Sequence, residues 1–143
     1  MTQKSNENSV FINGKQQVIE LVQRMDTADK AKLLKNLRMR NPSLAKELTE
    51  ACISFEGLWD LDEEGLKTLF SQVKPAILGL ALSLTHVRNQ RRALSVVSRQ
   101  MALTAFEIMQ KDLTANRNEC LRAQQKIVEL ALNLHRNKIL NFY

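Results

Sequence analysis

Apolar side chains recur along most of the chain at spacings of three and four residues, the period of an α-helix with one apolar face. Ala, Leu, Lys, Glu, Gln and Arg, which are good helix formers, fill these segments. Only four glycines and two prolines interrupt them, and no segment has a convincing strand pattern. The pattern therefore predicts an all-α fold.

Three amphipathic helices are predicted in the first third of the sequence, over residues 15–25, 28–39 and 42–53. Asp26 and Thr27 offer side-chain oxygens that can cap the second of them. Asn41 followed by Pro42 predicts the start of the third, because Asn is a favoured N-cap and Pro at the first helical position loses only an amide that would have no partner.

The segment SFEGLWDLD, residues 54–62, breaks this periodicity, and its Gly57 can adopt backbone angles that are closed to other residues. We interpret the segment as a hinge with at most one helical turn. Phe55 and Trp59 flank the glycine and could dock such a linker on a neighbouring lobe, although ordinary core packing would also explain them.

Five more helices are predicted beyond the hinge, over residues 63–73, 75–84, 88–97, 99–113 and 118–137. Asp60 or Asp62 can cap the first of them, and Ser98 separates the third from the fourth. The helix that begins at Pro75 is apolar almost all round, which predicts a place in the middle of a bundle. The apolar end of the chain, residues 139–143, should pack back or touch a partner.

The composition is that of an ordinary globular protein, with 44% apolar and 25% charged residues. At 143 residues the chain can fold as one compact domain or as two small helical lobes. Residues 1–15 are polar and lack an apolar stretch of secretion-signal length, which predicts a mobile tail and a cytoplasmic location. The apolar stretch from Pro75 to Leu84 is too short to cross a membrane.

Candidate chemistry is sparse. Cys52 and Cys120 lie far apart without a second Cys or His at metal-ligand spacing, which predicts free thiols and no metal site. His86 and His135 fall on different predicted helices, and neither adjoins a nucleophile motif. No glycine-rich phosphate loop, paired-carboxylate motif or dinucleotide fingerprint is present. The chain is therefore expected to be no enzyme and to bind no cofactor.

Lys and Arg outnumber Asp and Glu by 21 to 15, and the excess of +6 favours acidic partners or anionic surfaces. Arg88, Arg91 and Arg92, with Arg99 beyond them, would lie largely on one side of a helix. Such a face could neutralise nucleic-acid phosphates or meet an acidic protein surface. It lacks interleaved aromatic residues, however, and is also typical of a solvated helix. A basic adaptor is thus the alternative hypothesis, with nucleic acid the less favoured partner.

Four motifs follow one another along residues 16–138: RNPSLAKEL at 40–48, CISFEGLWDLDEEGL at 52–66, VKPAILGLAL at 73–82 and AQQKIVELA at 123–131. They resemble, in the same order, motifs of the C-terminal region of the flagellar motor switch protein FliG. The second is similar to the family's hinge, in which Met-Phe-x-Phe-Glu-x-Leu precedes L-x-L-D-D. On these motifs the chain is identified as a stand-alone FliG-like protein.

The resemblance implies an armadillo-like helical lobe over 16–51, a hinge over 52–57 and a six-helix lobe over 58–138, followed by an apolar tail over 139–143. The hinge residues it implies are Cys52, Ile53, Ser54, Phe55 and Gly57. In the family, the armadillo-like lobe packs against a matching lobe of the same or a neighbouring subunit. The residues expected at that interface here are Val18, Leu21, Leu33, Leu37, Leu44 and Leu48.

In the family, charges on a helix of the last lobe face the stator, and torque passes through them. The resemblance places Ser83 at the family's lysine and Thr104 at its arginine, with Lys111 and Asp112 at its acidic pair. We therefore expect that the torque-transmitting charges are largely not retained. The charges expected to face a stator or another partner are Lys111, Asp112, Arg88, Arg91, Arg92 and Arg99.

Together these features predict a structural or regulatory interaction component of the bacterial flagellar motor, at the cytoplasmic side of the flagellar base. The expected partners are FliG-like subunits, switch-complex or stator components, and further copies of the same chain. We expect a peripheral position at the membrane without a membrane span.

Overall fold

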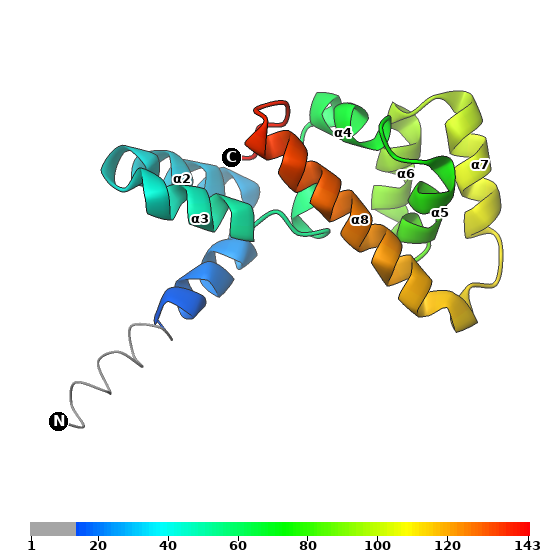
Figure 1. Ribbon diagram of the computed structural model, residues 1–143, viewed down its shortest axis with the longest axis horizontal. Helices are drawn as coiled ribbons and strands as arrows, with labels where there is room; N and C mark the ends of the chain where they lie inside the picture. The colour runs from blue at the N-terminus through cyan, green and yellow to red at the C-terminus, as the bar shows by residue number, and fades with distance from the viewer. Residues whose placement is uncertain (1–13) are drawn as a thin grey trace, which may run out of the picture. The chain divides into compact units, whose positions relative to one another are not determined.

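The computed structural model describes residues 14–143 (Figure 1). Within this range the secondary structure is helical and contains no strand, so the predicted all-α fold is confirmed. The chain divides into two compact units, one of residues up to Cys52 together with Tyr143 and the other from Ile53 to Phe142. The tail predicted at 1–15 lies mostly outside the described residues, and Gly14 and Lys15 belong to the first helix.

The first unit contains a helix over residues 14–24, α2 (Thr27–Arg40) and α3 (Pro42–Ala51). The Asp26 side chain caps α2 by accepting a hydrogen bond from the amide of Asp29 at 3.0 Å. Asn41 caps α3 by accepting one from the amide of Leu44 at 3.2 Å, and Pro42 occupies the first helical position. Both predicted helix starts are therefore confirmed.

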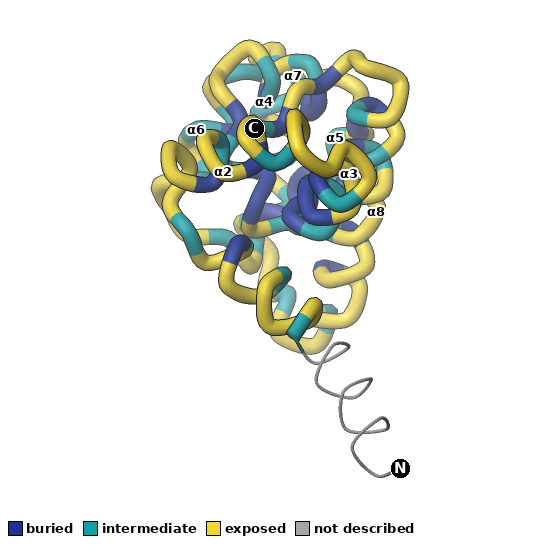
Figure 2. The backbone as a smooth tube through the Cα atoms, turned by 90° about the vertical axis from the view of Figure 1, so that its left-hand side faces the viewer, coloured by how far each residue is buried: buried dark blue, intermediate teal, exposed yellow. Residues whose placement is uncertain are grey.

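A small apolar core joins these three helices. Its buried apolar residues are Val22, Leu34, Ala45, Leu48 and Cys52. The Gln23 side-chain amide adds a hydrogen bond to the carbonyl of Ala51 at 2.7 Å, which ties the first helix to the end of α3. Figure 2 shows how buried and exposed residues alternate along the helices, as expected for amphipathic segments.

The second unit contains five α-helices and two 3-10 turns. In chain order these are η1 (Gly57–Asp60), α4 (Glu63–Phe70), α5 (Pro75–Leu82), α6 (Val87–Val96), α7 (Arg99–Met109), η2 (Thr114–Asn116) and α8 (Arg117–Arg136). Asp62, rather than Asp60, caps α4 by accepting a hydrogen bond from the amide of Gly65 at 2.8 Å. Ser98 caps α7 by accepting one from the amide of Met101 at 3.2 Å, so the predicted break at Ser98 is confirmed.

The apolar helix α5 packs on both α7 and α8 in the middle of this unit, as its lack of a polar face predicts (Figure 1). Gly79 allows a close approach of α7. A Cβ atom built on Gly79 would lie 2.7 Å from the carbonyl oxygen of Ala105 and 2.8 Å from Cβ of Ile108. The two helices therefore pack more tightly than any larger residue at this position would permit.

Four helices end at least two residues earlier than the apolar pattern predicts: α3 and α5 by two residues, and α4 and α7 by three and four. α4 ends at Phe70 rather than at 73, because the amide of Val73 turns back to the carbonyl of Phe70 at 3.1 Å. α7 ends at Met109 rather than at 113, and Asp112 then accepts hydrogen bonds from Thr114, which begins a separate turn. Apolar side chains continue past the ends of α4 and α7, so local hydrogen bonds decide these two boundaries.

The chain turns back after α8. Lys138 has a φ of 62°, and the amide of Ile139 donates to the carbonyl of Leu134 at 2.8 Å, which is the hydrogen bond of a Schellman turn. Leu140 and Phe142 are buried. The ring of Phe142 lies edge-on to His135 of α8, with 5.8 Å between the centroids, so this part of the apolar end packs on its own unit.

Gly79→Ala should lower the free energy of unfolding by about 1–3 kcal/mol, because the added methyl group overlaps the backbone of α7 at Ala105. Chemical denaturation followed by circular dichroism measures the change. Gly14→Ala is the control, since a Cβ there meets nothing within 4 Å and Ala is the better helix former. Equal stability of the Gly79 variant and the wild type would show that the α5–α7 contact is not tight.

Candidate functional site

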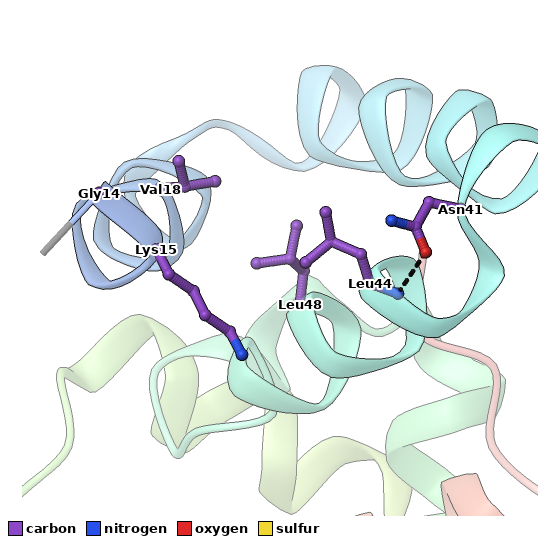
Figure 3. Close-up of a pocket in the computed structure, with 6 residues that line it drawn as sticks. All are labelled: Gly14, Lys15, Val18, Asn41, Leu44 and Leu48. Atoms are coloured by element: carbon purple, nitrogen blue, oxygen red, sulfur yellow. Dashed lines mark hydrogen bonds between the residues drawn. The ribbon is translucent and has the colours of Figure 1, made fainter. Parts of the chain in front are cut away.

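An apolar groove of about 570 Å³ lies on the first unit, between the helix over residues 14–24 and α3 (Figure 3). Its lining residues are Gly14, Lys15, Val18, Asn41, Leu44 and Leu48. In Figure 3 the side chain of Val18 points across the groove toward those of Leu44 and Leu48. The groove is thus a gap between apolar side chains from two helices that are separated in sequence.

The first helix is only partly covered by its own unit. Val22 is 1% exposed, whereas Val18, one helical turn earlier, is 45% exposed and Leu21 is 65% exposed. The apolar stripe of the helix therefore enters the core at one end and is open to solvent at the other. An apolar surface that continues a core in this way is typical of a site for a protein partner.

The six residues predicted for the armadillo-like interface lie at different depths. Those that line the groove are Val18, Leu44 and Leu48. Of the other three, Leu21 and Leu33 are exposed and Leu37 is half-buried, and none of them lines the groove. The structure therefore brings half of the predicted set together at one place.

Polar residues mark the edge of the groove. Lys15 Nζ lies 2.5 Å from Oε1 of Glu47 on α3, and both side chains are about half exposed to solvent. Exposed ion pairs contribute little to stability, so we expect this pair to add little to the packing of the first helix on α3. Lys15 is the one ionisable residue among the six that line the groove. The arrangement suits the burial of a partner's apolar side chains rather than acid–base chemistry.

The division between the two units falls between Cys52 and Ile53, inside the predicted hinge. Both residues are buried, and the hydroxyl oxygen of Ser54 accepts a hydrogen bond from the amide of Gly57 at 3.1 Å. This turn leads into η1, the single helical turn that the sequence predicts here. No described glycine has a positive φ, so this conformation does not use the backbone freedom expected of Gly57. Bending of the segment stays a prediction.

The aromatic residues of this segment pack on the second unit. The rings of Phe55 and Trp59 meet edge to face with centroids 5.8 Å apart, and Trp59 lies 5.6 Å from the ring of Phe70. Phe70 is fully buried in α4. Because aromatic pairs contribute beyond the area that they bury, this cluster anchors η1 and the residues before it to the core of the unit.

Arg92 contacts the backbone of its own unit. It is half-buried, and its Nη1 and Nη2 donate to the backbone carbonyls of Trp59 and Leu61 at 2.9 and 3.1 Å. The guanidinium group thus fastens the end of η1 to α6 by two charge-assisted hydrogen bonds. This role differs from the surface charge that the sequence predicts.

The other predicted surface arginines are exposed, whereas the guanidinium group of Arg92 is bonded to backbone carbonyls. Arg88 and Arg91 lie on α6, and Arg99 is the first residue of α7, beyond the break at Ser98. The basic surface of α6 therefore consists of two arginines. This is a smaller footprint than the sequence suggests for contact with phosphates.

Arg92→Ala should lower the free energy of unfolding by about 1.5–3 kcal/mol, because two hydrogen bonds from a charged donor are lost. Arg91→Ala, a change of the same size and charge at the exposed neighbour, should stay within about 0.5 kcal/mol of the wild type. Urea denaturation of the two variants measures both values. Equal effects would contradict the structural role of Arg92.

Two positions at which the resemblance implies torque charges carry uncharged side chains with local partners. Ser83 is the C-cap of α5, and its hydroxyl donates to the carbonyl of Leu80 at 2.6 Å and lies 3.2 Å from Sγ of Cys120. Thr104 is exposed on α7, and its hydroxyl donates to the carbonyl of Gln100 at 3.1 Å. Both hydroxyl groups therefore bond to their own helix or its neighbour.

Lys111 and Asp112 are exposed between α7 and η2. Oδ1 of Asp112 accepts hydrogen bonds from the hydroxyl of Thr114 at 2.5 Å and from the amide of Thr114 at 3.1 Å. Both bonds favour the ionised carboxylate and hold the pKa of Asp112 below its ordinary value of 3.8, and the bond from the hydroxyl has the larger effect. Asp112 is thus a fixed negative charge at this turn.

Within the described residues, no three His, Cys, Asp or Glu side chains come together in a way that could hold a metal ion. Cys52 and Cys120 are both buried, and neither is part of a disulfide. His86 accepts a hydrogen bond from the amide of Arg88 at 3.1 Å, while His135 packs on Phe142. Among the helices from residue 14 onward, none combines the length and apolar character needed to cross a bilayer.

Two findings could not be predicted from the sequence. One is that Gly14, Lys15 and Asn41 line the groove, and the other is that Arg92 bonds to the backbone near η1. Each of these roles depends on an element elsewhere in the chain, which a helical pattern does not locate. The opposite charges of Lys15 and Glu47 are visible in the sequence, but they form an ion pair only because the first helix packs beside α3.

Solved FliG structures resemble this fold. A crystal structure of residues 116–343 of FliG from H. pylori matches with a TM-score of 0.61 and 21% identity, covering 88% of this chain and 56% of that one. A second crystal structure, of residues 86–343 of FliG from H. pylori, matches with a TM-score of 0.57 and 20% identity, covering 99% of this chain and 70% of that one. The structure of full-length FliG from Aquifex aeolicus matches with a TM-score of 0.53 and 18% identity, covering 91% of this chain and 42% of that one. The molecule is thus an all-α protein with a FliG-like fold.

Sequence comparison gives the family. The FliG C-terminal domain, a non-enzymatic motor switch domain, matches residues 35–141, so the chain belongs to the FliG C-terminal domain family. The flagellar motor switch protein FliG of Borreliella burgdorferi is 24% identical over 130 residues, which are 91% of this chain. The chain spans 38% of the length of that relative.

Proposed function

We propose that the chain is a structural component of the bacterial flagellar motor and that it binds other FliG-like subunits through its first unit. Membership of the FliG C-terminal domain family supports a place at the motor switch, at the cytoplasmic side of the flagellar base. The observation that carries the binding role is the apolar groove, whose lining residue Val18 is 45% exposed, together with the 65% exposed Leu21 on the same helix.

The groove can receive apolar side chains from a partner's helix. Its volume of about 570 Å³ is enough for more than one leucine-sized side chain, and its lining is largely apolar. Each such side chain would contribute roughly 1.5–3 kcal/mol when fully buried. Recognition of this kind, an amphipathic helix laid into an apolar groove, needs no catalytic group.

In this proposal the first unit is the armadillo-like lobe of residues 16–51 and the second is the six-helix lobe of residues 58–138. The second unit contributes five α-helices, and η1 would take the place of a sixth short helix. The division between Cys52 and Ile53 supports a hinge over 52–57. Separate lobes on a hinge would let the groove engage a neighbouring subunit without moving the second unit.

The role is structural or regulatory, because the family's torque charges are largely not retained. Ser83 and Thr104 are uncharged, and Lys111 is basic where the resemblance implies an acid, so Asp112 alone matches. Arg88, Arg91 and Arg99 remain exposed and could contact a stator or switch component. The alternative, a basic adaptor on the Arg88, Arg91 and Arg92 face, is less well supported because Arg92 binds backbone carbonyls.

Deletion of the gene from motile cells tests the motor role. We expect an altered swimming speed, switching frequency, or number or placement of flagella, and return to normal with a plasmid copy. Tracking of swimming cells and electron microscopy of flagella measure these properties. If all of them were unchanged by the deletion, the motor role would be excluded.

Val18→Asp should weaken binding to full-length FliG from the same cells about tenfold or more, because the groove would have to bury an unpaired carboxylate. Isothermal titration calorimetry measures the dissociation constant. Gln17→Asp is the matched control, since it makes the same change of charge at the neighbouring exposed residue, which does not line the groove. Equal affinities for the two variants would show that the groove is not the interface.

A further inference from the structure

A row of exposed side chains on α2 takes no part in the groove. Lys32, Lys35 and Met39 follow one another at three- and four-residue spacing and therefore lie on one side of the helix, with Arg40 beside them. All four are exposed, Met39 by 83%. None of them lines the groove. We call these four residues the basic row.

Helix α2 carries a large share of the net charge of the chain. Its 14 residues include five basic side chains and one acidic side chain, a net +4 against +6 for the whole sequence. The helix dipole favours Arg40 in the last turn, but it does not explain Lys32 and Lys35 in the middle. The Lys15–Glu47 ion pair of this unit involves no residue of the basic row.

The opposite charge is concentrated in one segment of the second unit. Residues 56–64, EGLWDLDEE, contain five carboxylates and no basic residue, whereas basic residues outnumber acidic ones by twelve to four from residue 65 onward. The exposed carboxylates are those of Glu56, Asp62, Glu63 and Glu64. The helix dipole accounts for Glu63 and Glu64 in the first turn of α4, but Glu56 precedes η1 and is not part of that turn.

We propose that the basic row of one copy docks on the acidic segment 56–64 of a second copy. Two different surfaces meet in this contact, so it is head-to-tail and can continue into a ring or a row of copies. Complementary charge sets the orientation and the encounter rate. The flexible, exposed side chain of Met39 can pack on the half-buried Trp59 within the acidic segment, which adds an apolar contact between the charges.

Other occupants fit the basic row less well. Binding in a membrane surface would need an apolar helix face turned to the lipid, but the apolar side of α2 faces its own core, where Leu34 is fully buried. Nucleic acid would be recognised by phosphate contacts alone, since no aromatic residue lies on α2. Neither ligand gives a role to the acidic segment, whereas a second copy uses both surfaces.

The contact does not involve the groove, so it goes beyond the proposed function and the two can fail separately. Val18→Asp should leave the head-to-tail contact unchanged. If Val18→Asp abolished it equally with changes in the basic row, the association would belong to the groove and this inference would be wrong.

Sedimentation equilibrium of the full chain tests the proposal. We expect concentration-dependent self-association that is at least about tenfold weaker in about 0.5 M salt than in about 0.05 M salt, because salt screens exposed charges. The double variant Lys32→Glu with Lys35→Glu should lose this association. The matched control is Arg24→Glu with Lys46→Glu, which makes the same change of charge at exposed positions of the same unit outside the row and should stay within about twofold of the wild type.

A charge exchange makes the test specific. Glu63→Lys with Glu64→Lys should also lose self-association, and an equimolar mixture of this variant with Lys32→Glu, Lys35→Glu should recover it, because each variant then offers the surface that the other lacks. Thermal unfolding checks that the Lys variants remain folded, and Glu63→Gln with Glu64→Gln is a milder change that should also weaken association. Failure of the folded variants to associate when mixed would overturn the inference.

Titration with duplex DNA and with vesicles that contain anionic lipid completes the experiment. We expect no binding that depends on Lys32 and Lys35. A monomeric wild type that bound either probe, and lost that binding in the Lys32→Glu, Lys35→Glu variant, would show that the basic row contacts nucleic acid or membrane and not a second copy.

Discussion

A helix without a polar face is stable in water only when other helices surround it, and α5 imposes this constraint on the second unit. α7 and α8 pack directly on α5, and Gly79 allows the close approach of α7. The end of α5 is completed by polar residues of neighbouring helices. Gln124 of α8 donates to the carbonyl of Ala81 at 3.0 Å, and Gln90 of α6 donates to that of Leu82 at 2.7 Å, so carbonyls left without helical partners are satisfied.

The first unit has no counterpart of α5. Its three helices are short and amphipathic, and they bury Val22, Leu34 and Leu48 while Val18 stays at the edge. So few helices cannot cover all of their own apolar surface, because a small unit has much surface for its volume. The same hydrophobic effect that completes the second unit internally therefore leaves the first unit with a surface suited to a partner.

Some charged residues of the second unit stabilise its own structure through hydrogen bonds. Arg92 holds two backbone carbonyls, and Asp112 orders the turn at Thr114. On α2, by contrast, Lys32 and Lys35 are exposed, and neither takes part in the Lys15–Glu47 ion pair. The location of a charge among its neighbours, more than the net charge of the chain, thus indicates which surface a partner could use.

The sequence by itself determined the all-α class, the order of the helices and most of their starts, because period, proline and capping side chains act within one or two turns. Asn41, Asp62 and Ser98 all cap the helices that their positions predict. Only the tertiary structure decided which side chains meet. The gap between Val18 and Leu44, and the bonds from Arg92 to η1, join segments far apart in the chain. Local patterns specify the face of each helix, but the packing of all the helices together decides which part of that face stays uncovered.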